Sequence, residues 1–364
     1  MYSESDVQSA VAAGAISPEA AQALRRHVAS LNAASAVDEE QFRLVTGFND
    51  IFVSIACLLV IFAAAATGGT IGGTVLGAGL VAVAAWVMAE VFTRRRRMAL
   101  PSIILLLAFV LGLGIAAYNL LGLTFPEHVV RTPYQVDGKT LTWERYERLP
   151  WQVALMTLGG AVAAGAVALL HWRRFRVAIT IAAAVGSLVA IILASVAAVR
   201  DVKPWEDPVL TPVALLCGLL VFAYAMRWDV SDRVRRTQRA DVAFWLHLVA
   251  APLIAHPLFH WMGVTTGHNI DAATAAGVVA IYLSFALVAL AVDRRALLVS
   301  ALAYVLIALA QLFRSYGAIE LNVALTALLI GSALLALSAG WAAIRRRWIG
   351  ILPESLRSAL PPAA

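Results

Sequence analysis

Long apolar stretches, separated by short polar segments, run through most of the chain. A helix needs about 20 apolar residues to cross the roughly 30 Å hydrocarbon core of a bilayer. We interpret ten stretches as such helices: 48–66, 71–92, 100–121, 151–172, 177–199, 209–226, 242–262, 273–292, 296–313 and 321–343. The pattern therefore predicts an all-α, polytopic integral membrane protein with a ten-span membrane domain over residues 48–343.

The basic residues between these stretches predict the orientation, because cytoplasmic loops carry an excess of Lys and Arg. When the N-terminus is placed in the cytoplasm, the arginine-rich segments on the cytoplasmic side are 94–97, 173–176, 227–239, 294–295 and 345–347. Removing one span would invert every later loop and destroy this agreement. We therefore expect both termini in the cytoplasm of a bacterial cell, a multi-pass location in the inner membrane, and a cytosolic C-terminal tail over 344–364.

Residues 1–47 are predicted to form a small cytosolic helical hairpin and a linker. Ser5 and Gln8 have the spacing of a capping box at the start of a first helix. Ser17 is placed to cap a second helix, and a third helix is expected to begin near Asp38 and to lead into the first span. This unit is a candidate docking surface for a cytosolic or membrane protein partner.

The segment 124–150 is the only sizeable extracytoplasmic loop in this topology. It contains Asp137-Gly138, a two-residue signal for a tight hairpin turn, flanked by 134–136 and 139–141. The loop is therefore predicted to hold a β-hairpin.

Composition supports a lipid environment and excludes a nucleic-acid partner. Of the 364 residues, 61% are hydrophobic and 14% are charged, whereas a soluble domain carries about 25% charged residues. The net charge of +6 comes from short basic runs between apolar stretches, which is how membrane topology is encoded. The partner we expect is the lipid bilayer, no cofactor is implied, and Cys57 and Cys217 are expected to be buried free thiols.

A cluster of glycines lies between the first two predicted spans. Gly69, Gly73 and Gly77 are four residues apart and would share one face of a regular helix, where they would let a neighbouring backbone approach closely. A phosphate-binding loop would need a following Lys, which is absent here. We interpret these glycines as packing residues.

Ionisable side chains within spans are candidates for function, since they are costly to place in lipid. Glu90 precedes Arg94 by four residues, so an ion pair between them is the simpler interpretation. Asp50 and Asn49 begin the first span and are expected at the membrane interface. All three remain candidates for a polar substrate path.

The seventh predicted span combines His247, His256 and His260 with Pro252 and Pro257. The prolines free backbone carbonyls that must be satisfied inside the bundle, so this span is expected to be interior. His256 and His260 are four apart and share a face, while His247 would point to the opposite side. The histidines are therefore candidates for a polar or proton-linked path.

A metal site is the more specific alternative for the histidines of this span. His256 and His260 could be joined by His268 and Asp271 from the following loop. No acidic residue completes an HExxH pattern, so we expect no metal there.

Two segments carry a resemblance to a known family. They are GAISPE at 14–19, in the N-terminal hairpin, and RLVTGFND at 43–50, at the membrane entrance. Together with the string of hydrophobic spans, the first third of the chain resembles the bacterial predicted membrane proteins of the domain of unknown function 2157 family. The resemblance implies a multi-span inner-membrane protein and brings no activity or active-site residue.

Three functions follow as hypotheses. The first is a transporter or permease-like protein for a small solute. The second is a non-catalytic membrane scaffold or sensor that uses the N-terminal helices, and the third is a membrane-embedded enzyme with a His-based site. Since the chain contains no nucleophile elbow and no His near either cysteine, the enzyme is the least favoured.

Overall fold

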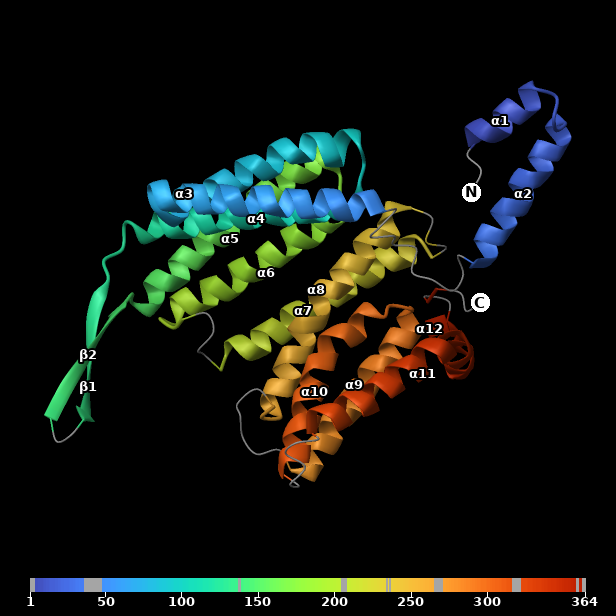
Figure 1. Ribbon diagram of the computed structural model, residues 1–364. Helices are drawn as coiled ribbons and strands as arrows, with labels where there is room; N and C mark the ends of the chain where they lie inside the picture. The colour runs from blue at the N-terminus through green and yellow to red at the C-terminus, as the bar shows by residue number, and fades with distance from the viewer. Residues whose placement is uncertain are drawn as a thin grey trace.

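The computed structural model describes residues 4–35, 48–136, 139–203, 208–233, 235, 237–264, 271–315, 322–357 and 360–361. Among these, eight helices are long and apolar enough to cross a membrane. Figure 1 shows the apolar helices packed side by side with their connections at the two ends of the bundle. The predicted class, an all-α polytopic membrane protein, is confirmed.

The elements follow the predicted spans closely. The helices of the bundle are α3 (Phe48–Ala89), α4 (Ala99–Gly122), α5 (Pro150–Phe175), α6 (Ile179–Val199), α7 (Leu210–Ser231), α8 (Gln238–Trp261), α9 (Ala272–Val292), α10 (Ala296–Ser315) and α11 (Asn322–Ile351). A π-helical segment, η1 (Glu90–Arg95), continues α3, and a short helix, α12 (Glu354–Arg357), follows α11. Helix α11 thus runs past residue 343, where the cytosolic tail was expected to begin.

Helix α3 reverses direction in its middle. Gly72 and Gly73 leave the helical region, and Gly73 has a φ of 70°, which favours glycine. A Cβ on Gly68 would lie 2.6 Å from the Cα of Gly77, so the two arms pack backbone against backbone. The predicted common face of Gly69, Gly73 and Gly77 on one regular helix is therefore wrong, because Gly73 lies in the turn and Gly69 and Gly77 lie on opposite arms. The packing role itself holds for Gly68 and Gly77.

Small residues also bring the next helices together. A Cβ on Gly112 of α4 would lie 2.9 Å from the carbonyl oxygen of Ala78 in α3. A Cβ on Gly160 of α5 would lie 2.9 Å from the carbonyl oxygen of Gly114 in α4. Such contacts provide close van der Waals packing, which holds helices together in lipid.

Helix α8 occupies the interior, as its prolines predict. It packs against α6, α7 and α10, and it is the most buried of the eight apolar helices. Pro257 is buried, whereas Pro252 is exposed. Cys57 and Cys217 are buried free thiols, as predicted.

A two-stranded ribbon projects from the bundle at the end opposite the C-terminus (Figure 1). Its strands, β1 (His128–Val136) and β2 (Lys139–Glu147), are antiparallel, and Val136 pairs with Lys139. The strands therefore flank the predicted two-residue turn, whose residues lie outside the described part of the chain. Arg131 and Glu144 form a cross-strand ion pair at 2.9 Å.

The N-terminal unit contains α1 (Glu4–Ala12) and α2 (Pro18–Ser35). The Ser17 hydroxyl accepts a hydrogen bond from the Ala20 N–H at 3.1 Å, so its predicted capping role is confirmed. Because α1 already begins at Glu4, Ser5 lies inside the helix, and the predicted capping box is wrong. The third helix expected near Asp38 lies outside the described residues.

Candidate functional site

His256 and His260 lie together on α8, as their spacing predicts. Their rings stack with centroids 5.9 Å apart, and His256 Nδ1 lies 2.9 Å from the Tyr304 hydroxyl of α10. Neither His256 nor His260 lines any of the five cavities characterised among the described residues. The structure thus gives this pair a helix–helix contact and no described cavity.

The other two metal candidates do not extend this pair. His268 lies outside the described residues. The Asp271 carboxylate caps α9 by accepting the Thr274 N–H at 2.8 Å, and the hydrogen bonds from Thr274 hold its pKa below the usual value. Within the described ranges, no three His, Cys, Asp or Glu side chains are grouped as a metal site would require.

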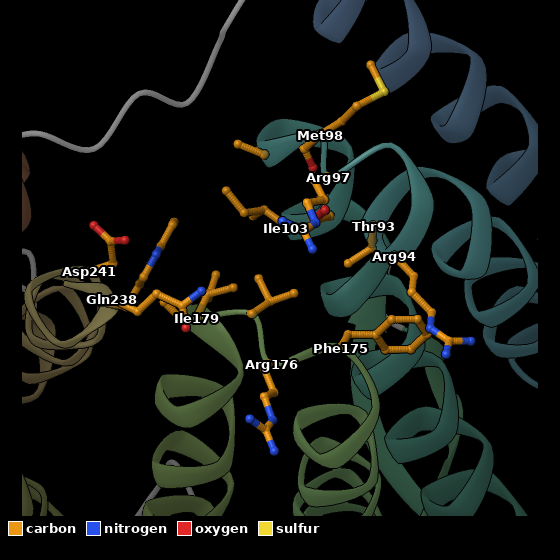
Figure 2. A pocket seen from close by; sticks show the side chains of 15 residues that line it. Thr93, Arg94, Arg97, Met98, Ile103, Phe175, Arg176, Ile179, Gln238 and Asp241 are labelled. Atoms are coloured by element: carbon orange, nitrogen blue, oxygen red, sulfur yellow. The ribbon is translucent and has the colours of Figure 1, made fainter.

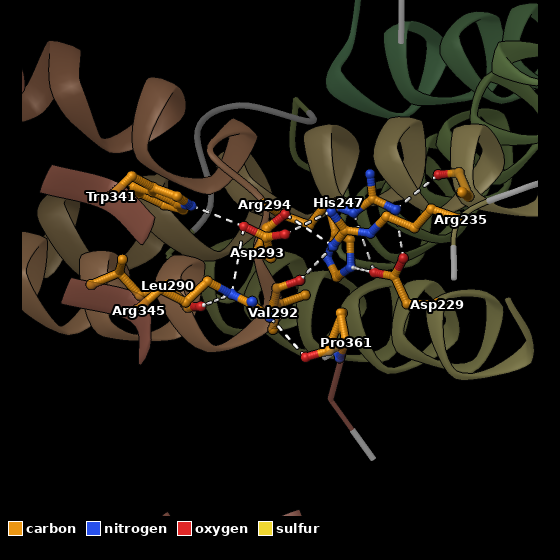
Figure 3. Close-up of polar contacts among 11 residues, drawn as sticks. Asp229, Arg235, His247, Leu290, Val292, Asp293, Arg294, Trp341, Arg345 and Pro361 are labelled. Atoms are coloured by element: carbon orange, nitrogen blue, oxygen red, sulfur yellow. Dashed lines mark hydrogen bonds and ion pairs between the residues drawn. The ribbon is translucent and has the colours of Figure 1, made fainter. Parts of the chain in front are cut away.

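His247 belongs to a separate buried cluster (Figure 3). Its Nε2 lies 2.9 Å from the carboxylate of Asp229 in α7, and the same carboxylate accepts a hydrogen bond from Arg294, between α9 and α10. Asp229 and Arg294 are each 3% exposed, and His247 is fully buried. Neither Asp229 nor Arg294 was expected at a site, because both lie within arginine-rich segments, 227–239 and 294–295, that were interpreted as loops.

Asp293 extends this cluster toward α11. Its carboxylate accepts hydrogen bonds from Arg235 and from the Trp341 indole N–H, each at 2.9 Å. Arg345 approaches the same carboxylate at 3.5 Å. Asp293 has a φ of 58°, so this residue ends α9 with a left-handed backbone and turns the chain toward α10.

The C-terminal segment is joined to the same cluster through its backbone. Arg345 Nη2 donates to the Pro361 carbonyl at 2.8 Å, and Arg233 Nη2 donates to the Leu360 carbonyl at 2.8 Å. The cluster therefore links α7, α8, α11, the α9–α10 turn and the tail.

Buried charges are tolerated when they are paired, and the charges of Asp229, Asp293, Arg235 and Arg294 are. Arg235 Nε and His247 Nδ1, however, have no hydrogen-bond partner among the described residues. We assign the cluster a structural role.

The acidic candidates near α3 have partners of their own. Glu90 pairs with Arg94 at 3.3 Å, as predicted, and also with two nitrogens of Arg174 in α5, at 2.7 and 3.0 Å. Asp50 is buried at the start of α3, and Asn49 is exposed. Since Glu90 contacts α5, His247 contacts α7 and His256 contacts α10, these contacts do not assemble one continuous polar path.

A cavity of about 590 Å³ lies at the arginine-rich end of the bundle. It is formed by the turn after η1, the turn between α5 and α6, and the first turns of α8 (Figure 2). Its polar and charged lining residues are Thr93, Arg94, Arg97, Ser102, Arg176, Gln238 and Asp241. Figure 2 shows Gln238 and Asp241 on α8, across the cavity from the turn that carries Arg97.

Several of these polar groups are not used by the protein itself. Arg97 and Arg176 follow helix ends with left-handed backbones, φ 52° and 53°, and neither guanidinium has a partner within the described ranges. Figure 2 shows Arg176 extending away from Arg97. The buried Thr93 hydroxyl has no hydrogen-bond partner there either. A buried polar group in this state is an available contact for a ligand.

The fold therefore defines a multi-pass helical membrane protein with a polar, arginine-lined cavity of ligand size at an end of the bundle. Comparison with family models, with curated proteins and with solved structures finds no match to this chain.

Proposed function

We propose that the chain is a ten-span, permease-like protein of the bacterial inner membrane that binds a small polar solute from the cytoplasm. The count of ten takes the two arms of α3 as separate spans, because the chain reverses at Gly72–Gly73, and includes α10. Arginines crowd the end of the bundle that holds the cavity, so the positive-inside rule supports a cytoplasmic opening.

The observation that carries this proposal is the placement of Arg97 and Asp241 on opposite walls of the cavity, beside the unpartnered Thr93 hydroxyl. A guanidinium binds a carboxylate or phosphate through charge-assisted hydrogen bonds, and an aspartate accepts from an ammonium or another donor. The cavity volume falls in the range of about 300–1,000 Å³ that is usual for small-molecule sites. The solute class we infer is a small amphoteric molecule with one anionic group and one donor group.

Solute binding tests the site. Purified full-length chain should bind members of a panel of amino acids and other amphoteric solutes, measured by calorimetry. Arg97→Ala should weaken that binding at least tenfold, since a hydrogen bond to a charged group contributes about 1.5–3 kcal/mol. Asp241→Asn should do the same for solutes that carry an ammonium group.

Arg173→Ala is the matched control, because Arg173 is exposed at the same end of the bundle and does not line the cavity. Equal losses in Arg173→Ala and Arg97→Ala would contradict a site at the cavity. Proteoliposome uptake of a bound solute then separates the two leading hypotheses. Binding without flux would exclude the permease and leave a sensor.

Reporter fusions test the topology. Fusions at Thr140 and Arg235 should report opposite compartments, because α5, α6 and α7 lie between them. A fusion at Arg346 should report the same compartment as Arg235. If the Thr140 and Arg235 reporters fall on the same side, the ten-span topology and the cytoplasmic opening are both wrong.

A further inference from the structure

An apolar groove of about 630 Å³ runs along the outer face of α5, α6 and α7. It is lined by Val162, Gly165, Ala166, Leu169, Trp172, Thr180, Ile181, Ala184, Val185, Leu188, Ile191 and Tyr224. On α6 the lining extends from Thr180 to Ile191, which spans about 16 Å at 1.5 Å per residue. That length matches one leaflet of a hydrocarbon core roughly 30 Å thick.

A second cavity, of about 340 Å³, adjoins the groove at its arginine-rich end. It is lined by Tyr224, Arg227, Trp228, Ser231 and Arg239, and Tyr224 lines both spaces. No acidic side chain lines it, and the nearest described carboxylate on α7, Asp229, faces the buried cluster instead. In the described part of the chain, the side chains of Arg227 and Arg239 are not engaged in ion pairs.

We propose that these adjoining spaces form a binding site for an anionic glycerophospholipid of the arginine-side leaflet. Arg227 and Arg239 bind the phosphate, and an acyl chain occupies the groove between α5, α6 and α7. The arginines supply the charge complementarity, since basic pockets between membrane helices bind anionic headgroups and a guanidinium fork matches phosphate geometry. This site is separate from the solute cavity, with which it shares no lining residue.

The inference is tested by native mass spectrometry of the full chain in detergent. The protein is titrated with phosphatidylglycerol or with phosphatidylcholine of the same chain length. We expect preferential retention of phosphatidylglycerol. The double variant Arg227→Gln/Arg239→Gln should weaken binding of phosphatidylglycerol about thirtyfold, because each basic residue contributes about 1 kcal/mol to binding of an anionic lipid. Its binding of phosphatidylcholine should be unchanged.

The control is Arg95→Gln/Arg96→Gln, which removes the same charge from exposed residues at the same end of the bundle. Equal losses in the two double variants would overturn the site in favour of general surface attraction. Equal retention of the two lipids by the wild-type chain would overturn it as well. If the double variant does not yield monodisperse protein, Arg239→Gln alone is used, and an unchanged lipid preference then counts against the proposal.

The acyl part is tested separately. Ala166 is exposed in the groove, so Ala166→Phe should fill it and weaken retention of phosphatidylglycerol. Soluble glycerol phosphate, which lacks acyl chains, should bind far more weakly than the lipid. Binding of glycerol phosphate as tight as that of the lipid would show a small-anion site and exclude the lipid.

Discussion

Asp229→Ala is expected to destabilise the folded chain by about 3–5 kcal/mol, because it leaves the buried Arg294 without a counter-charge. Arg294 donates to both Asp229 oxygens, and His247 shares the same carboxylate. All three side chains are buried, so water does little to solvate the charge left on Arg294. The loss is measured as a fall in thermal stability of the purified protein in detergent.

Two further variants serve as a control and as a rescue for Asp229→Ala. Glu144→Ala removes an exposed ion pair on the β-hairpin, and such pairs contribute about 0–1 kcal/mol. In Asp229→Ala/Arg294→Leu the uncompensated charge is gone, so part of the stability should return. A melting temperature for Asp229→Ala equal to that of Glu144→Ala would contradict the assigned role of the cluster.

Gly68→Val is the second change expected to have a large effect. Even the first carbon of a side chain at Gly68 would meet the backbone of Gly77 at 2.6 Å, and no rotamer relieves a backbone clash. The arms of α3 must then separate, at a cost of about 1–3 kcal/mol or more. Gly69→Ala is the control, since a Cβ there meets no atom within 4 Å. A loss in Gly69→Ala as large as in Gly68→Val would show that the close approach is unimportant.

The spans were predictable because hydropathy is local. A run of about 20 apolar residues specifies a membrane helix whatever its neighbours are. The reversal within α3 was also predicted, because an apolar run of more than 40 residues is too long for one span and was divided into 48–66 and 71–92. The position of the turn was not, since Gly72 and Gly73 fall inside the second predicted span. Several glycines in this stretch could form the turn, and the backbone shows that Gly72 and Gly73 do.

The polar contacts were predictable only where they are local. Glu90 and Arg94 are four apart and were expected to pair, but Arg174 is 84 residues from Glu90 in the chain. Asp229 and Arg294 are separated by 65 residues. No pattern in one sequence shows which helices adjoin, so His247 was found as a candidate while its partners were missed.

The cavity at the arginine-rich end of the bundle could not be predicted for a different reason. Arg94, Arg97 and Arg176 carry the topology signal, and that signal fully accounts for basic residues at helix ends. The same arginines line the cavity because the turns after η1 and α5 bring them there. One residue type therefore both indicates orientation and lines the cavity, and composition cannot separate the two.

The backbone contacts of the C-terminal segment constrain how its sequence can vary. Leu360 and Pro361 hold Arg233 and Arg345 with carbonyl oxygens that any residue type would supply. Exchanging a side chain there leaves both contacts in place, whereas inserting or deleting a residue upstream moves a different carbonyl into each position. Natural variants of this chain should accordingly drift in the identity of these two residues while keeping constant the spacing that separates them from α11.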